Sequence, residues 1–173
     1  WTHKAARQAG TVHLGGTLSQ IAATEKQAVK GNLYECPFVL VGQQYLADPS
    51  RSDGEHHPVW AYAHVPQGYP YDVTEHIVRQ IERYAPGFRD IIVDSVSYST
   101  ETLEGYNENY VGGDIIGGAT DMRQLLARPI FSADPYATGV SGVYLCSAST
   151  PPGAGVHGMC GLQAARRALK LLV

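Results

Sequence analysis

Two stretches of the chain carry apolar residues at helical spacing behind recognisable start signals. Thr17 and Gln20 are spaced as a capping box, which predicts a helix that begins here and ends at Gly31. Asp72 precedes a second stretch with the same spacing, and we expect this helix to continue until Pro86 ends it. Each helix is therefore expected to turn one face toward a sheet.

Strands are expected where β-branched and aromatic residues gather between turn residues. The segments 37–46 and 59–65 have this composition, and the polar segment 49–57 between them is typical of a hairpin-like loop. A third strand is expected over 90–99. The pattern predicts an α+β fold, in which a mixed or antiparallel sheet has helices on one face.

The end of the sequence combines a strand pattern, a glycine-rich turn and a helix. A short helix is expected over 122–127, and a strand over 142–148. Residues 153–158 spell G-x-G-x-x-G, in which glycines let the backbone approach a pyrophosphate at a helix N-terminus. No second strand and no acidic residue about 20 positions on follow this turn, although a first Rossmann unit needs both. The final helix is expected to bury Cys160, Ala164, Ala165, Ala168 and Leu169.

Four segments of the chain resemble motifs of a known family and follow one another in the order found in that family. The run 142–169 resembles the C-terminal signature of the phytoene-desaturase-like FAD-dependent oxidoreductases, which are more distantly related to the amine oxidases. Segments 9–16, 81–90 and 109–115 are similar to the same family. The resemblance implies the C-terminal portion of a phytoene dehydrogenase-like enzyme, without the first Rossmann half that holds the ADP part of FAD.

The resemblance also implies a domain division and a reaction. Residues 1–135 would be part of a substrate-binding domain, and residues 136–173 the last strand, turn and helix of an FAD-binding domain. The implied cofactor of the parent enzyme is FAD, and the implied reaction is hydride transfer between an apolar small-molecule substrate and the flavin. The isolated 173-residue chain is expected to be inactive and to hold no FAD, because it lacks the ADP-binding half. No convincing catalytic acid or base stands out, so the catalytic residues remain unassigned.

The glycine-rich turn is the main candidate site. In the resembled family it contacts the cofactor, and free N–H groups at a helix N-terminus favour electron-rich oxygens. A steric need for glycine in a tight turn is the alternative explanation. Related flavoproteins often have an acidic residue at the preceding strand end, where this sequence has serine and alanine. The implied cofactor-binding residues are Ser147, Ala148, Gly153, Gly155, Val156, His157 and Gly158.

The segment 109–118 is a second candidate, because it holds two glycine pairs that can approach a planar ligand or adopt positive φ. Gly113 and Asp114 are implied cofactor contacts, but a role for Asp114 as a turn residue is slightly favoured. The ring of His157 is suited to proton donation, yet we expect its backbone to matter more.

Other reactive residues give weaker signals. His56 and His57 lie in a polar loop without metal-ligand spacing, so no metal site is expected. Cys146 is expected to point into the core from a buried strand, and the absence of a G-x-S-x-G elbow argues against a hydrolase. Trp60 and Tyr62 fit either an apolar substrate channel or, more commonly, core or sheet-face packing.

The composition indicates which binding partners and which cellular compartment to expect. A net charge of −3 over 173 residues gives no electrostatic basis for nucleic-acid binding. No apolar stretch approaches the ~18 residues of a transmembrane helix. Three cysteines without a C-x-x-C pair indicate a reducing compartment, so a cytoplasmic location is expected.

Two alternative hypotheses stay open. The chain is either a non-catalytic folded remnant that binds no cofactor alone, or a subunit that completes its site with a separate Rossmann half. In the second case an apolar face would be available for that partner or for a homodimer. The substrate's identity, the electron acceptor and any membrane contact are not indicated by the sequence.

Overall fold

The protein is described here by a computed structural model that covers residues 1–170. The chain divides into two compact units, Trp1–Thr102 and a second unit from Leu103 onward. Both contain helices, and the first contains a three-stranded sheet, so the α+β class is confirmed. The expected boundary between a substrate-binding part and an FAD-binding part, at residues 135 and 136, refers to the domains of a larger enzyme. It stays a prediction.

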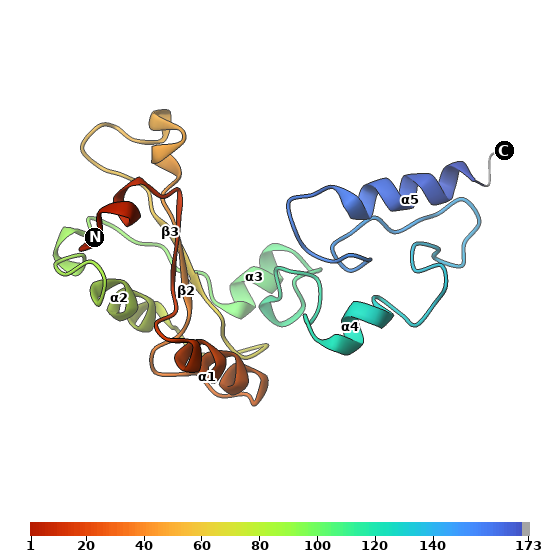
Figure 1. Cartoon of the computed structure of the whole chain (residues 1–173), viewed down its shortest axis with the longest axis horizontal. Coiled ribbons are helices and arrows are strands. Elements are labelled where there is room, and N and C mark those ends of the chain that lie inside the picture. Colours follow the sequence, from red (N-terminus) through yellow and green to blue (C-terminus); the bar gives the residue numbers. More distant parts are fainter. Residues whose placement is uncertain (171–173) are drawn as a thin grey trace. The chain divides into compact units, whose positions relative to one another are not determined.

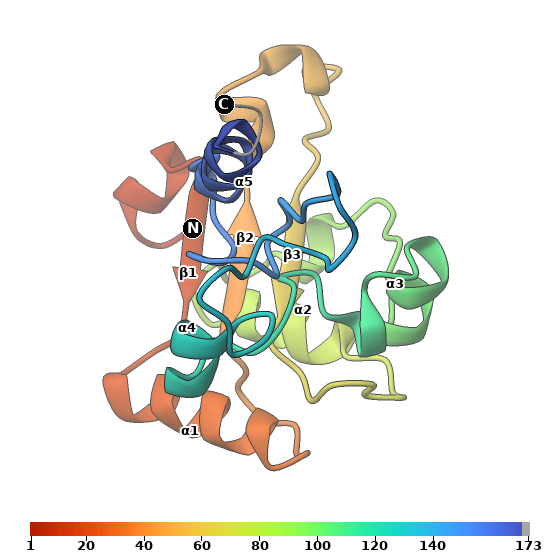
Figure 2. The ribbon, with the colours of Figure 1, turned by 90° about the vertical axis from the view of Figure 1, so that its right-hand side faces the viewer.

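The first unit is built on an antiparallel sheet with the order β1-β2-β3 (Figure 2). The strands are β1 (Thr11–Leu14), β2 (Val39–Gly42) and β3 (Trp60–Ala63). In the register, Leu14 pairs with Val39, and Val39 pairs with Ala63. The strands expected at 37–46 and 59–65 are therefore confirmed with shorter bounds, whereas β1 was not among the expected strands.

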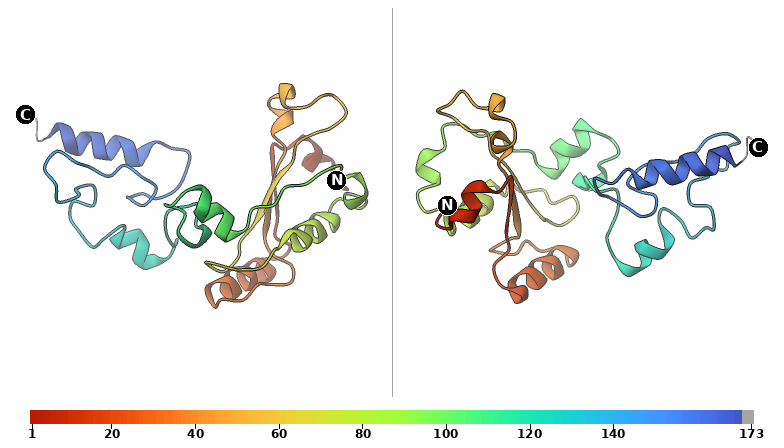
Figure 3. Two further views of the ribbon diagram at one scale, coloured as in Figure 1. Left: turned by 180° about the vertical axis from the view of Figure 1, so that it is seen from behind. Right: turned by 45° about the horizontal axis from the view of Figure 1, so that its top comes forward.

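Helix α2 (Thr74–Glu82) covers one face of this sheet, as the edge-on views of the strands show (Figures 1 and 3). The helix begins close to the predicted start, but its N-cap is Val73, which makes no side-chain cap hydrogen bond; the carboxylate of Asp72 instead accepts from the backbone N–H and hydroxyl of Thr74. Burying each aliphatic side chain of such a core contributes roughly 1.5–3 kcal/mol. The buried core of the unit consists of Leu14, Val39, Val41, Ile81 and Ala85.

Helix α1 (Leu18–Val29) lies beyond one end of the strands (Figure 1). Its predicted capping box is present: the Thr17 hydroxyl accepts from the Gln20 backbone N–H, and the Gln20 side chain accepts from the Thr17 backbone N–H. Thr24 is buried, and its hydroxyl donates to the carbonyl oxygen of Gln20 in the preceding turn. The sequence therefore predicted both the start and the extent of this helix.

The face of the sheet opposite α2 is polar and aromatic, and part of it is open to solvent. The register places His13, Leu40 and Tyr62 side by side in one row. Trp60 pairs with Gly42, two residues before Tyr62 on the same face, and is 52% exposed, so it is not a core residue. Of the packing roles expected for this aromatic residue, its position fits the sheet face and not the core.

Two expected strands do not form. The segment 90–99 is largely irregular, and Val93 and Val96 are exposed. The segment pairs with no strand in the described structure, so it gains neither a hydrogen-bonded ladder nor a buried face. The segment 142–148 makes a single bridge, between Ala137 and Tyr144.

The second unit consists of short helices joined by long loops: α3 (Thr100–Tyr106, which begins in the first unit), α4 (Met122–Ala127) and α5 (Met159–Leu169). The helix expected at 122–127 is confirmed. Across the two units, short 3₁₀ helices form at Lys4–Gln8, Gln44–Leu46, Pro49–Arg51, Arg89–Ile91 and Val111–Gly113.

Only one row of α5 is buried. Cys160 and Ala164 are buried one turn apart, and Ala168 continues this row half-buried. Ala165 and Leu169 lie on the neighbouring row and are exposed, so their expected burial is wrong. Among the residues described, no helix is both long and apolar enough to cross a membrane.

Candidate functional site

The glycine-rich turn surrounds a small hollow at the N-terminus of α5. Glycine is required there by the backbone, since φ is 103° at Gly153 and 64° at Gly158, values that side-chain-bearing residues rarely adopt. A Cβ at position 155 would lie 2.6 Å from the ring of His157. The hollow has a volume of about 180 Å³ and is lined by Cys146, Ala148, Gly153, Gly155, His157, Gly158, Met159, Cys160 and Gly161.

Five of the predicted cofactor-binding residues line this hollow: Ala148, Gly153, Gly155, His157 and Gly158. Two others do not. The Ser147 hydroxyl accepts from the backbone N–H of Ser149, and Val156 is fully exposed. The structure thus gathers most of the predicted turn around one site.

The ring of His157 acts as a local cap. Its Nδ1 atom lies 3.0 Å from the backbone nitrogen of Met159 and accepts that N–H, so Nδ1 carries no proton in this arrangement. The bond satisfies one of the N–H groups that a helix start leaves unpaired. The contact gives His157 a positioning role in this turn.

The second predicted segment folds into a turn held by Asp114. Its two carboxylate oxygens accept the backbone N–H groups of Ile116 at 2.8 Å and of Gly118 at 2.6 Å. This arrangement fits the favoured role of Asp114 as a turn residue. Gly113 precedes it with φ of 82°. Neither Gly113 nor Asp114 lines the hollow, and their contact with a cofactor stays a prediction.

The loop that follows Asp114 nevertheless reaches the glycine-rich turn. A Cβ at Gly117 would lie 3.1 Å from both the backbone nitrogen and the hydroxyl of Ser149. Glycine is therefore needed at this position for close approach as well as for its φ of 76°. The two predicted glycine segments meet inside the second unit.

Arg128 is the site residue that the sequence analysis missed. It is only 5% exposed, and its Nη2 donates to the carbonyl oxygens of the loop described above, at 3.5, 3.3 and 3.2 Å for Gly117, Gly118 and Ala119. Its only sequence signal is a position between a short helix and Pro129, which gives no indication of burial.

Hydrogen bonds from a cysteine and a threonine side chain hold the glycine-rich turn and the residues before it against α5. The buried Cys160 thiol donates weak hydrogen bonds to the carbonyl oxygens of Thr150 and Gly153. Thr150 is itself fully buried, and its hydroxyl donates to the carbonyl oxygen of Ser147. Cys146 is exposed, so the expectation that it points into the core is wrong; the strand that would have buried it does not form.

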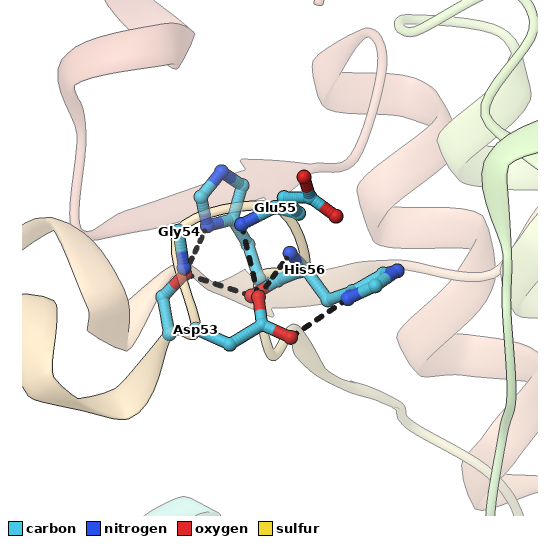
Figure 4. A network of polar contacts seen from close by, with 6 residues as sticks. Asp53, Gly54, Glu55 and His56 are labelled. Carbon is cyan, nitrogen blue, oxygen red and sulfur yellow. Dashed lines mark hydrogen bonds and ion pairs between the residues drawn. The ribbon is translucent and has the colours of Figure 1, made fainter.

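A polar network organises the loop 49–57 of the first unit (Figure 4). Asp53 accepts from the backbone N–H of His56, and this bond, with the His56 ring beside it, holds the pKa of Asp53 well below its usual range. The Ser52 hydroxyl lies 2.8 Å from the His57 ring and donates to the carbonyl oxygen of His56. Because its proton is already engaged, Ser52 is not an activated nucleophile.

No metal centre is visible in the part of the chain that the structure describes, since no group of three histidine, cysteine or acidic residues is placed to hold an ion. A larger hollow of about 460 Å³ lies in the first unit, where apolar and aromatic side chains predominate. Its lining includes Trp1, Val12, His13, Leu14, Ile21, Phe38 and Tyr84.

Comparison with known proteins finds relatives among curated proteins. The chain is 38% identical over 86 residues to pyridine nucleotide-disulfide oxidoreductase domain-containing protein 2 from Rattus norvegicus, and equally to the protein of that name from Mus musculus. The match covers 49% of this chain and 15% of each relative, so the chain corresponds to a small part of their length. No family model and no solved structure matches. The chain is therefore related to proteins named for an oxidoreductase domain, and their names do not specify phytoene dehydrogenase.

Proposed function

We propose that the chain is the C-terminal portion of an FAD-dependent oxidoreductase of the phytoene dehydrogenase-like kind, which transfers hydride between an apolar substrate and flavin. One observation carries this proposal: the hollow at the N-terminus of α5 is bounded by glycines with positive φ. Similarity to proteins named for an oxidoreductase domain supports the reaction class.

The residues around this hollow fit a flavin group. The absence of a side chain at Gly155 lets the ring of His157 lie close against the turn, and the positive end of the α5 dipole favours electron-rich oxygens. Bound FAD would supply the redox chemistry. The chain's own residues would then orient the ring: Ala148 and Gly153 would form the wall, and His157 would hold the first turn of α5.

The substrate proposal rests on the first unit. Its 460 Å³ hollow and the partly exposed Trp60 on the open face of the sheet provide surfaces suited to an apolar small molecule.

The proposed location is the cytoplasm. The three cysteines, Cys36, Cys146 and Cys160, are free thiols, which fits a reducing environment.

A second candidate function is that of a subunit that is completed by a partner. The second unit exposes large apolar side chains, with Phe131 91% and Leu126 79% exposed, while α5 buries only Cys160 and Ala164. A missing Rossmann half or a second copy of the chain would bury such surface. Under this hypothesis the isolated chain is non-catalytic and binds no cofactor alone.

Titration with FAD tests the proposal. Saturable quenching of flavin fluorescence at micromolar FAD, confirmed by calorimetry, would mean that the unmodified chain forms a flavin site by itself. Gly161→Leu should abolish such binding, because Gly161 lines the hollow and a Cβ there meets no other atom, so the larger side chain would occupy the hollow. Gly105→Leu, a matched change on α3 with equal space, should bind as the unmodified chain does. Absence of FAD binding by the unmodified chain would contradict an autonomous flavin site and favour the subunit hypothesis.

A further inference from the structure

Arg128 is a buried cation without an anionic partner. Its Nε atom is fully buried and has no hydrogen-bond partner, and within residues 1–170 no carboxylate lies within ion-pair distance of its guanidinium. The three carbonyl contacts of Nη2 are long, at 3.2–3.5 Å, and carry only partial negative charge. Burying a charge is costly unless it is paired, so this arrangement calls for a counter-charge.

The hollow at the start of α5 is the place where such a counter-charge fits. Nη1 of Arg128 lies directly against Gly153, which lines that hollow, and a Cβ at position 153 would collide with it. Because residue 153 has no side chain, Nη1 can approach the backbone of this wall residue closely, although Arg128 itself is 5% exposed and does not line the hollow. The partly positive N-terminus of α5 lies on the same hollow and adds to the attraction for an anion.

We propose that Arg128 binds an oxyanion of a flavin nucleotide in this hollow. The inference rests on the proposed function for the identity of the nucleotide and deepens it by naming the residue that provides the charge. The oxyanion has two sources with the same chemistry: a phosphate oxygen, or the pyrimidine oxygen of the reduced, anionic ring. A guanidinium suits either, since its fork of N–H donors matches paired oxygens.

Two probes and a matched pair of variants test the assignment. Inorganic pyrophosphate represents the phosphate source, and dithionite-reduced lumiflavin, which has no phosphate, represents the ring. Arg128→Met removes the charge and keeps the length of the side chain, whereas Arg123→Met removes an exposed charge from α4. We expect Arg128→Met to weaken binding of at least one probe by roughly 10- to 100-fold, as expected for loss of a hydrogen bond to a charged group. Arg123→Met should bind as the unmodified chain does.

A thermal-shift readout separates binding from a merely structural role. The bound probe should raise the melting temperature of the unmodified chain and of Arg123→Met, but not that of Arg128→Met. Arg128→Gln serves as the second variant should Arg128→Met fail to fold. The affinity of the unmodified chain for pyrophosphate should also fall as salt is added, if phosphate is the source.

The outcomes distinguish this inference from the proposed function. The role of Arg128 is overturned if a folded Arg128 variant binds both probes as tightly as the unmodified chain does. It is also overturned if the unmodified chain binds neither probe. If FAD still binds in those cases, the flavin function stands without it. Binding of pyrophosphate through Arg128 without binding of FAD or lumiflavin would keep the anion site and overturn the flavin assignment.

Discussion

The buried side-chain amide of Gln80 donates a hydrogen bond of 3.0 Å to the backbone carbonyl oxygen of Leu14. Gln80 lies on α2 and Leu14 at the end of β1, so this bond ties the helix to an edge strand of the sheet. The Gln80 carbonyl oxygen in turn accepts from Arg83 at 2.7 Å. Both ends of the buried amide are therefore satisfied, as a polar group in a core requires.

Replacing this amide should destabilise the first unit. Gln80→Ala leaves the Leu14 carbonyl without its partner and creates a cavity, so we expect a loss of about 2–4 kcal/mol in the free energy of unfolding. Arg79→Ala, an exposed change on the same helix, should cost far less. Tryptophan fluorescence during urea unfolding measures this directly, because Trp1 and Trp60 both belong to the first unit. Equal stability of the two variants would contradict the role of Gln80.

The capping box of α1 gives a second stability prediction. Thr17→Ala removes the hydroxyl that accepts the Gln20 N–H, and should cost about 1 kcal/mol. Thr17→Ser keeps an acceptor in the same place and should restore most of the loss. The same urea experiment compares the two variants, and identical midpoints for serine and alanine would show that the cap does not stabilise the helix.

The turn after α2 should make the stability of the first unit dependent on pH. The Glu82 carboxylate accepts from the backbone N–H groups of Arg89 and Gly87, which lowers the pKa of Glu82. A lowered folded-state pKa means that the stabilisation is complete above the ordinary glutamate value, about 4.3, and is lost as pH falls through the folded value.

Glu82→Gln should therefore flatten the acid limb of the stability curve relative to the unmodified chain. Glu55→Gln changes an exposed glutamate elsewhere in the same unit and serves as the control. Unfolding midpoints in urea between pH 3 and 7 provide the measurement. Curves of the same shape for Glu82→Gln and the unmodified chain would refute the linkage.

Local signals predicted the helices α1, α2, α4 and α5 but not α3 (Thr100–Tyr106), and the strands were limited by non-local pairing. The starts of α1 and α2 follow from side chains within a few residues of each helix, at Thr17 and Asp72. A strand also needs a neighbour, and the apolar segment 90–99 has none in the described structure, so composition alone misassigned it. In contrast, β1 is only four residues long and is defined by its pairing with β2.

The candidate site shows the same limit. The glycine pattern located the hollow, because positive φ at Gly153 and Gly158 is a local backbone property. Arg128 enters the site through contacts with loops about ten residues before it and twenty-five residues after it, at Gly118 and Gly153. Nothing in the sequence near Arg128 indicates either contact.

The contact between Gly153 and Arg128 gives the last prediction. Gly153→Ala places a methyl group where Nη1 now lies and forces alanine into a φ of 103°, so we expect a loss of about 1–3 kcal/mol from backbone strain, in addition to displacement of the guanidinium. Gly161→Ala is the matched control: its Cβ meets no atom, and alanine in a helix interior should stabilise by roughly 0.5–1 kcal/mol.

The two alanine variants should therefore shift stability in opposite directions. Neither tryptophan lies in the second unit, so the measurement is amide hydrogen exchange along α5, where Gly153→Ala should speed exchange and Gly161→Ala should slow it. Loss of pyrophosphate binding in Gly153→Ala, with α5 still protected, would indicate that the methyl group acts mainly by covering Arg128. Unchanged exchange and unchanged binding would contradict the close contact, because a methyl group cannot share that position with the guanidinium.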